Sequence, residues 1–106
     1  MKYIPLVLLV LLSAGYIKAE DVHTEHTGFH KEAATQMEKM GAEMKMMKST
    51  GNPDKDFAAM MISHHQGAVE MAESYLKYGK DEELKKMASK MIEDQKNEIQ
   101  MMKAKL

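Results

Sequence analysis

The chain has 106 residues, the size of one domain, and carries 15 basic and 16 acidic side chains for a net charge of −1. This balance lacks the basic excess of nucleic-acid-binding domains, so we expect no nucleic-acid partner. Cysteine is absent, which excludes disulfides, whereas methionine, normally an uncommon residue, occurs 13 times.

Residues 1–19 have the layout of a secretory signal peptide. Lys2 supplies a positive charge, residues 4–12 (IPLVLLVLL) are apolar, and residues 13–19 (SAGYIKA) are mostly small. The apolar run is shorter than the roughly 20 residues that a membrane span requires. We therefore expect cleavage after Ala19, a periplasmic or secreted protein, and no membrane association of the mature chain. An uncleaved N-terminal anchor is the alternative.

Residues 20–29 (EDVHTEHTGF) are polar and lack helical periodicity, so they predict a flexible leader. The leader contains His23 and His26, and His30 follows it directly. Imidazoles at this spacing could collect Cu(II) or Zn²⁺ loosely. If processing leaves His23 as the third residue, the free amine, backbone amides and imidazole could form a square-planar Cu(II) clamp. A solvated tail without metal is the alternative.

The first helical pattern covers about residues 30–48. Its apolar positions recur at alternating spacings of four and three, and most are methionine: Ala33, Met37, Met40, Met44 and Met47. Met46 falls on the opposite side of this helix, where core packing does not explain a methionine. Residues 49–53 (STGNP) contain the glycine and proline that end the helix.

The second helical pattern covers about residues 55–78, with Asp54 as the expected N-cap and Gly79 as the expected C-cap. Two adjacent apolar stripes run along this helix. The first stripe is Phe57, Met61, His64, Ala68, Met71, Tyr75 and Tyr78, and the second is Ala58, Ile62, His65, Val69, Ala72 and Leu76. A face of this width predicts contact with more than one other helix.

The third helical pattern covers about residues 82–105, with Asp81 as its expected N-cap. Its apolar face consists of Leu84, Ala88, Met91, Ile92, Ile99, Met102 and Leu106. Gln95 and Glu98 lie on the same face, where a buried carboxylate would need a partner such as a histidine N–H. A carboxylate in that position could orient a metal-bound histidine. Alternatively, the face reaches solvent at these two residues.

Together these patterns predict an all-α protein. Short connections between the three helices make neighbouring helices antiparallel, so residues 30–106 form a small antiparallel helical bundle. Because three short helices enclose little core, a homodimer could complete it.

The stretch MMISHHQGAVEMA at residues 60–72 suggests a site for a soft metal ion. Adjacent helical residues point about 100° apart, so His64 and His65 flank the apolar arc on two sides. Thioethers select Cu(I) and imidazole also binds copper, whereas Zn²⁺ gains little from methionine. The candidate ligands are His64, His65, Met60, Met61, Met71, Met40, Met44 and Met47, with Met46 as an auxiliary contact. The same methionines could instead fill an irregular core.

Three motifs resemble one known family. They are D-x-x-F at 54–57, MISHHQGAVEMA at 61–72 and Q-x-x-E-I-x-x-M at 95–102. The chain is similar here to domain of unknown function 305, a ferritin-like helical family that includes Met-rich, exported copper-binding members of the CopM type. The resemblance implies a helical bundle, periplasmic residence and copper binding. Ser63 stands where the family often has proline, which implies a straighter helix.

Three functions are compatible with these features. An exported copper-binding protein would buffer Cu(I) or transfer it to or from a copper-exporting or copper-accepting protein. A helical interaction module would use its Met-rich face to bind a protein partner without metal. A ferritin-like di-metal oxidase would need Glu-x-x-His motifs on two helices. The only such motif, at residues 20–23, lies in the leader, so we expect no enzyme.

Overall fold

The computed structural model describes the backbone of residues 19–106 and the side chains of residues 28–106. Three helices, α1 (Ala19–Met46), α2 (Pro53–Tyr78) and α3 (Glu82–Lys103), account for almost all of this part, which contains no strand. The all-α prediction is therefore confirmed. None of the described helices is long and apolar enough to span a bilayer. The expected signal peptide, except for its last residue, lies outside the described residues.

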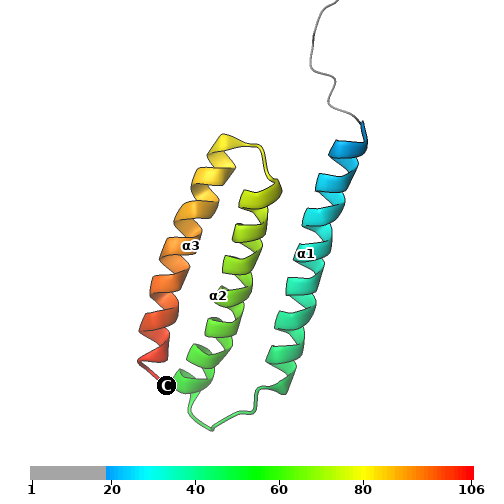
Figure 1. Ribbon diagram of the computed structural model, residues 1–106. Coiled ribbons are helices and arrows are strands. Elements are labelled where there is room, and N and C mark those ends of the chain that lie inside the picture. Colours follow the sequence, from blue (N-terminus) through cyan, green and yellow to red (C-terminus); the bar gives the residue numbers. More distant parts are fainter. Residues whose placement is uncertain (1–18) are drawn as a thin grey trace, which may run out of the picture.

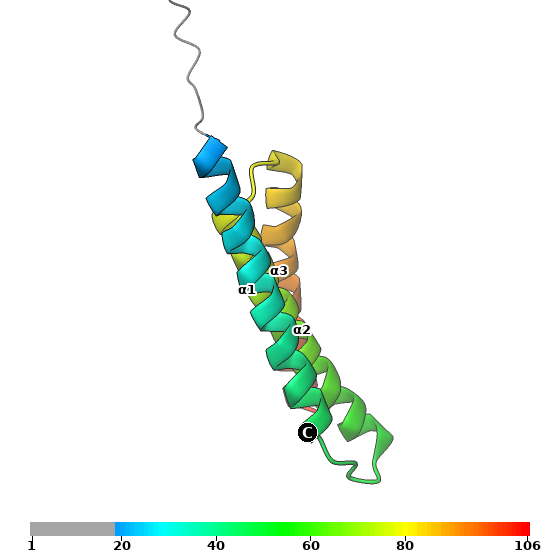
Figure 2. The same cartoon turned by 90° about the vertical axis from the view of Figure 1, so that its right-hand side faces the viewer.

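The three helices lie side by side in one layer with α2 in the middle (Figures 1 and 2). Neighbouring helices run antiparallel, as the short connections predicted. The backbone of α2 approaches both α1 and α3, whereas no Cα atom of α1 comes within 8 Å of one in α3. The layer therefore has two packing seams, one on each side of α2, and two open faces.

The first helix begins well before its expected start at His30. The prediction of a non-helical leader over residues 20–29 is wrong, because α1 already begins at Ala19. No proline interrupts this stretch, and Glu20 and Asp21 stand where the positive end of the helix dipole favours acidic residues. A polar helix without an apolar stripe gives no periodic signal, which explains the error.

Two of the three predicted capping residues, Gly79 and Asp81, are confirmed. The N-cap of α2 is Asn52 rather than Asp54, because the Asn52 side chain accepts hydrogen bonds from the amides of Asp54 and Lys55 at 3.0 and 3.4 Å. Pro53 can then take the first helical position, where its missing N–H costs nothing. The Asp81 side chain caps α3 by accepting from the Leu84 amide at 2.9 Å. Gly79 ends α2, as predicted.

The apolar interior of this layer is built mostly from alanine, with one valine and one isoleucine. The buried apolar residues of the described part are Ala58, Val69, Ala72, Ala88 and Ile99, and none of its large side chains is fully buried. The apolar stripes are only partly covered. Phe57, Leu84 and Met91 remain 63%, 49% and 46% exposed.

A cluster of hydrogen bonds to one carboxylate, that of Glu32, joins α1 to α2. Glu32 accepts hydrogen bonds from Ser74 at 2.6 Å, Lys77 at 2.8 Å and the Tyr78 hydroxyl at 3.0 Å. The Lys77, Ser74 and Tyr78 bonds together lower the Glu32 pKa from 4.5 to about 2. Gly28 lets the Tyr78 ring approach, since a Cβ there would lie 2.8 Å from that ring. The cluster therefore fixes the register of the two helices.

We predict that Glu32→Gln loosens the α1–α2 seam and lowers the thermal midpoint by a few degrees. Because folding depresses the Glu32 pKa, its stabilising contribution is complete above pH 4.5 and is lost as pH falls toward about 2. Thermal unfolding followed by circular dichroism should show a shallower acid dependence over that window for the variant. The control is Glu38→Gln, an exposed carboxylate on the same helix. Equal effects of the two substitutions would contradict the role of Glu32.

Candidate metal site

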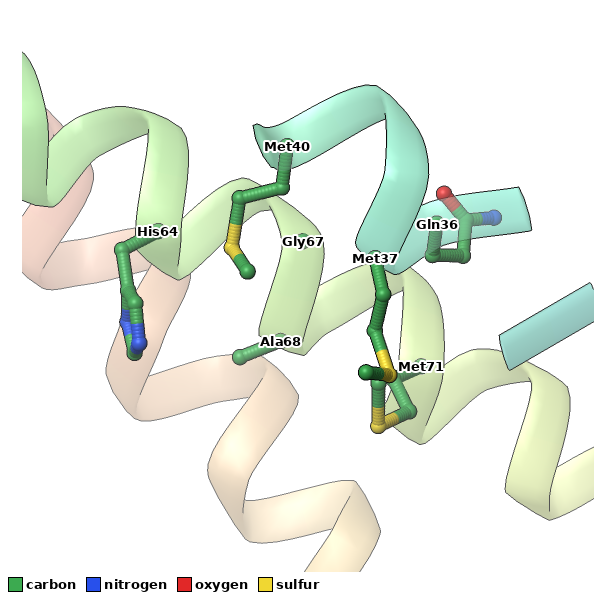
Figure 3. Close-up of a pocket in the computed structure, with 7 residues that line it drawn as sticks. All are labelled: Gln36, Met37, Met40, His64, Gly67, Ala68 and Met71. Atoms are coloured by element: carbon green, nitrogen blue, oxygen red, sulfur yellow. The ribbon is translucent and has the colours of Figure 1, made fainter. Parts of the chain in front are cut away.

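A cleft of about 200 Å³ opens where the middle of α1 crosses α2. Its lining consists of Gln36, Met37 and Met40 from α1 and His64, Gly67, Ala68 and Met71 from α2 (Figure 3). The lining contains three thioethers, one imidazole and no carboxylate. This combination suits a soft cation rather than one that prefers oxygen.

The side chains line the cleft from both helices. In Figure 3 the Met40 side chain reaches over α2 beside His64, and the sulfurs of Met37 and Met71 point toward one another. On α2, His64 and Met71 are seven residues apart, close to two helical turns, and therefore share one side of the helix. His64 and Met37 are exposed, while Met40 and Met71 are half-buried. The cleft is thus accessible from solvent on the His64 side.

Gly67 makes room for Met40. A Cβ built on Gly67 would lie 3.2 Å from the Met40 sulfur, 3.6 Å from its Cβ and 3.7 Å from its Cγ. Any larger residue at 67 would therefore displace the thioether by a few tenths of an ångström or more. Glycine in a helix interior costs about 0.5–1 kcal/mol relative to alanine. Gly67 therefore lowers the stability of the α2 helix, and it provides the space that the Met40 side chain occupies.

The two histidines occupy different seams, as their 100° separation predicted. His64 lies in the cleft, whereas His65 packs toward α3 with its Nε2 2.5 Å from Oε2 of Glu98. Their ring centroids are 6.2 Å apart. If Nε2–H donates to Glu98, Nδ1 carries the lone pair; it is buried and has no hydrogen-bond partner within the described part. His65 therefore acts here as an interhelical contact.

The carboxylate of Glu98 does meet a histidine, as expected from its position on the apolar face of α3. Gln95 lies half-buried one turn earlier on α3. The histidine that Glu98 contacts is His65 and not His64, so this pair lies outside the methionine cleft. A role in orienting a metal-bound histidine stays a prediction.

Three other candidate ligands gather at a different place. Met44, Met47 and Met60 line a wider hollow of about 570 Å³ at the α1–α2 turn, next to Leu106. Met61 is half-buried and lines neither this hollow nor the cleft. The candidates named from sequence are therefore divided between separate places.

The remaining histidines and Met46 lie apart from the cleft. Met46 is 80% exposed at the end of α1, which agrees with its position opposite the methionine stripe. His30 is exposed on α1, and the side chains of His23 and His26 lie outside the described residues. Between residues 28 and 106, no three His, Asp or Glu side chains form a group that could hold a metal ion.

Four residues of the cleft were not selected as site residues from sequence, namely Gln36, Met37, Gly67 and Ala68. Met37 and Ala68 were placed only in apolar stripes, and Gly67 was noted only as part of the family motif. The signal for Met37 was present, because it precedes Met40 by three residues and shares its side of the helix. The role of Gly67 could not be found without knowing that α1 crosses α2 at that residue.

The comparison with known families agrees with the motif resemblance. Residues 9–106 match the family model described as Domain of unknown function (DUF305). The match covers nearly the whole chain, so the chain belongs to this family. No curated protein matches the sequence.

We predict that Gly67→Ala displaces the Met40 thioether while leaving α2 intact. The chemical shift of the Met40 methyl group, measured by NMR on methyl-labelled protein, should change in this variant. Gly41→Ala is a matched control on α1, because a Cβ there meets no atom within 4 Å. The control should gain about 0.5–1 kcal/mol in unfolding free energy from its higher helix propensity. An unchanged Met40 signal in Gly67→Ala would contradict the crossing geometry.

Proposed function

We propose that this member of the DUF305 family binds Cu(I) as cargo through Met37, Met40, Met71 and His64. The observation that carries the proposal is that these side chains, from two helices, line one cleft of about 200 Å³. Residues on one helix can be neighbours through helical spacing alone. Here Met37 and Met40 come from α1 and the other two ligands from α2, so the packing of two helices brings them to the same cleft (Figure 3).

The donor chemistry favours Cu(I) over other common metal ions. Thioether sulfur is a soft, uncharged ligand that selects Cu(I), and imidazole is compatible with it. Mg²⁺, Ca²⁺ and Mn²⁺ require oxygen ligands, and Zn²⁺ uses Cys, His and carboxylates. Only Gln36 offers an oxygen in the cleft lining. The expected Cu(II) site at His23, His26 and His30 remains a separate, weaker possibility for the oxidised ion.

The openness of the cleft supports buffering or transfer rather than permanent storage. Met37 is 57% exposed and His64 is exposed, so an incoming donor could replace these ligands one at a time. The chain has no cysteine, which suits a compartment where thiols oxidise, and residues 1–19 have the layout of an export signal. We therefore assign the protein to the periplasm or the exterior, where it would receive copper from an exporter or deliver it to an acceptor.

A second candidate function is a helical interaction module without metal. Its support is the number of large apolar side chains left exposed on this chain, among them Phe57 at 63% and Met87 at 59%. Met-rich surfaces adapt to varied partners. This function requires no affinity for Cu(I), so a metal titration separates the two candidates. A di-metal oxidase has no comparable support, because residues 28–106 contain no group of three His, Asp or Glu side chains that could hold a metal ion.

We predict tight uptake of Cu(I), measured anaerobically against a chromophoric chelator. Met40→Leu and His64→Ala should each weaken the affinity by at least tenfold, because even the loss of a partner outside the metal's own ligands typically costs about 10–100-fold. Leucine nearly conserves the volume of methionine, so the Met40→Leu fold should persist.

Met101→Leu is the control for methionine content. Met101 is 69% exposed on α3 and lies outside the cleft, so this substitution should leave the affinity unchanged. Failure of the parent protein to compete with the chelator would eliminate the copper function and favour the interaction module. Equal losses for Met40→Leu and Met101→Leu would place the copper at another site.

A further inference from the structure

The open face of the helix layer beside His64 is apolar along its length. The copper cleft continues into a second hollow of about 290 Å³, and the two share Ala68 and Met71 on α2. This second hollow is bounded by Phe29 on α1 and by an exposed ridge on α3. The ridge consists of Leu84, Met87 and Met91. Together the two hollows form one groove between α1 and α3, with α2 as its floor.

Charged side chains are excluded from this face on α1. At 100° per residue, all six charged residues of α1 between 28 and 46 fall in the half of the helix away from the groove. They are Lys31, Glu32, Glu38, Lys39, Glu43 and Lys45. The opposite arc contains Phe29, His30, Ala33, Ala34, Gln36, Met37, Met40, Gly41 and Met44. Contact with α2 needs only part of this arc, and the remainder has no partner within the described chain.

The floor of the groove repeats this pattern. The α2 residues that line it are uncharged, namely His64, Gly67, Ala68, Met71, Ala72 and Tyr75. The ion pairs Lys39–Glu70, Lys77–Glu32 and Lys96–Glu73 belong to the two seams. On α3, Glu98 lies on the same side as Met87 and Met91, where it contacts His65 at 2.5 Å. Asp94 lies next to this side and pairs with Lys90 at 2.7 Å. The layer therefore has one polar face and one largely apolar face, and the Glu98 and Asp94 carboxylates at the α3 edge of the apolar face have partners within the chain.

We infer that a second copy of this chain covers the largely apolar face. A two-fold interface places each surface against an identical surface, so any unpaired charge near the axis would meet its own kind. The floor and the α1 side of this face carry no charge, and Glu98 and Asp94 at its α3 edge already have partners. Alanine and glycine at positions 33, 34 and 41 also allow the α1 helix of one copy to approach the groove of the other closely.

The size of the face matches this occupant. The 22 residues of α3 span about 33 Å at 1.5 Å per residue. Three helix axes packed about 8–10 Å apart give a width of roughly 20 Å. The resulting area of about 650 Å² is close to the roughly 800 Å² that each partner buries in a stable interface. The second copy would also supply the core that a single layer lacks, since none of the large described side chains is fully buried.

The dimer is tested by sedimentation of the purified protein without metal, after its N-terminus has been defined by mass spectrometry. We expect a dimer at micromolar concentrations. Met87→Glu should weaken association by at least tenfold, because it places two like charges in an apolar interface. Met87 is 59% exposed in the single chain and does not line the copper cleft, so the substitution should preserve helix content and leave the proposed copper ligands in place.

Met101→Glu is the matched control, because it makes the same change on the same helix at a residue outside the groove. This variant should remain dimeric. A parent protein that is monomeric up to millimolar concentration would overturn the inference, as would equal behaviour of the two glutamate variants. Monomeric protein that floats with neutral phosphatidylcholine vesicles would identify the face as a lipid-binding surface instead. None of these measurements uses metal, so they test the dimer separately from the copper function.

Discussion

The arrangement of this protein depends on α2, which is the only described helix that packs on both of its sides. The backbones of α1 and α3 stay more than 8 Å apart, so each helix is held to the domain by a single seam. The α1 seam is organised by Glu32, which binds Ser74, Lys77 and Tyr78 at once. The α3 seam includes His65 and Glu98. With both flanks of α2 used in this way, its remaining apolar stripe has no helix to cover it.

The uncovered stripe is also what makes a metal site possible. In a closed bundle His64, Met71 and the α1 methionines would face an interior filled by another helix, and the thioethers would serve as packing. In an open layer they line a cleft that an ion can enter from solvent. Gly67 contributes to this arrangement, since its missing Cβ lets Met40 lie over α2 with its sulfur next to the cleft. The proposed ligands are therefore drawn from the same apolar stripes that pack the helices together.

Sequence patterns predicted the helices better than their assembly. The methionine stripe of α1 and the double stripe of α2 located both helices and showed that α2 has two neighbours, because these stripes reflect local periodicity. The division of His64 and His65 between two seams followed from the same geometry. The cap of α2 was misplaced by two residues because Asn52 and Asp54 are both good capping residues. Pro53, a residue favoured at the first helical position, is the sequence signal that points to Asn52.

The composition of the site was less predictable, because it depends on where two helices cross. Met37, Met40, Met44 and Met47 are equivalent in the sequence. The crossing at Gly67 nevertheless places the first two in the cleft, Met40 beside His64 and Met37 beside Met71, and leaves the others at the turn. Likewise, nothing local distinguishes a methionine that binds an ion from one that packs against a neighbour. Tertiary packing makes that distinction, and helical spacing does not report it.

The cleft proposed to bind copper and the largely apolar face cannot be independent, because they share Ala68 and Met71 and lie on the same side of the layer. A second copy over the groove would reduce access to the cleft and remove water from around His64 and Met37. Binding of an ion and association of two chains would then be coupled, and the coupling must be equal in both directions. If copper in the cleft favours the dimer, copper promotes association and the dimer in turn retains copper. If copper in the cleft opposes the dimer, binding of copper separates the two copies and leaves the ligands accessible for exchange. In either case, methionine rather than cysteine or carboxylate is the suitable residue for this face, because it can serve as packing in one state and as a ligand in the other without a change of charge.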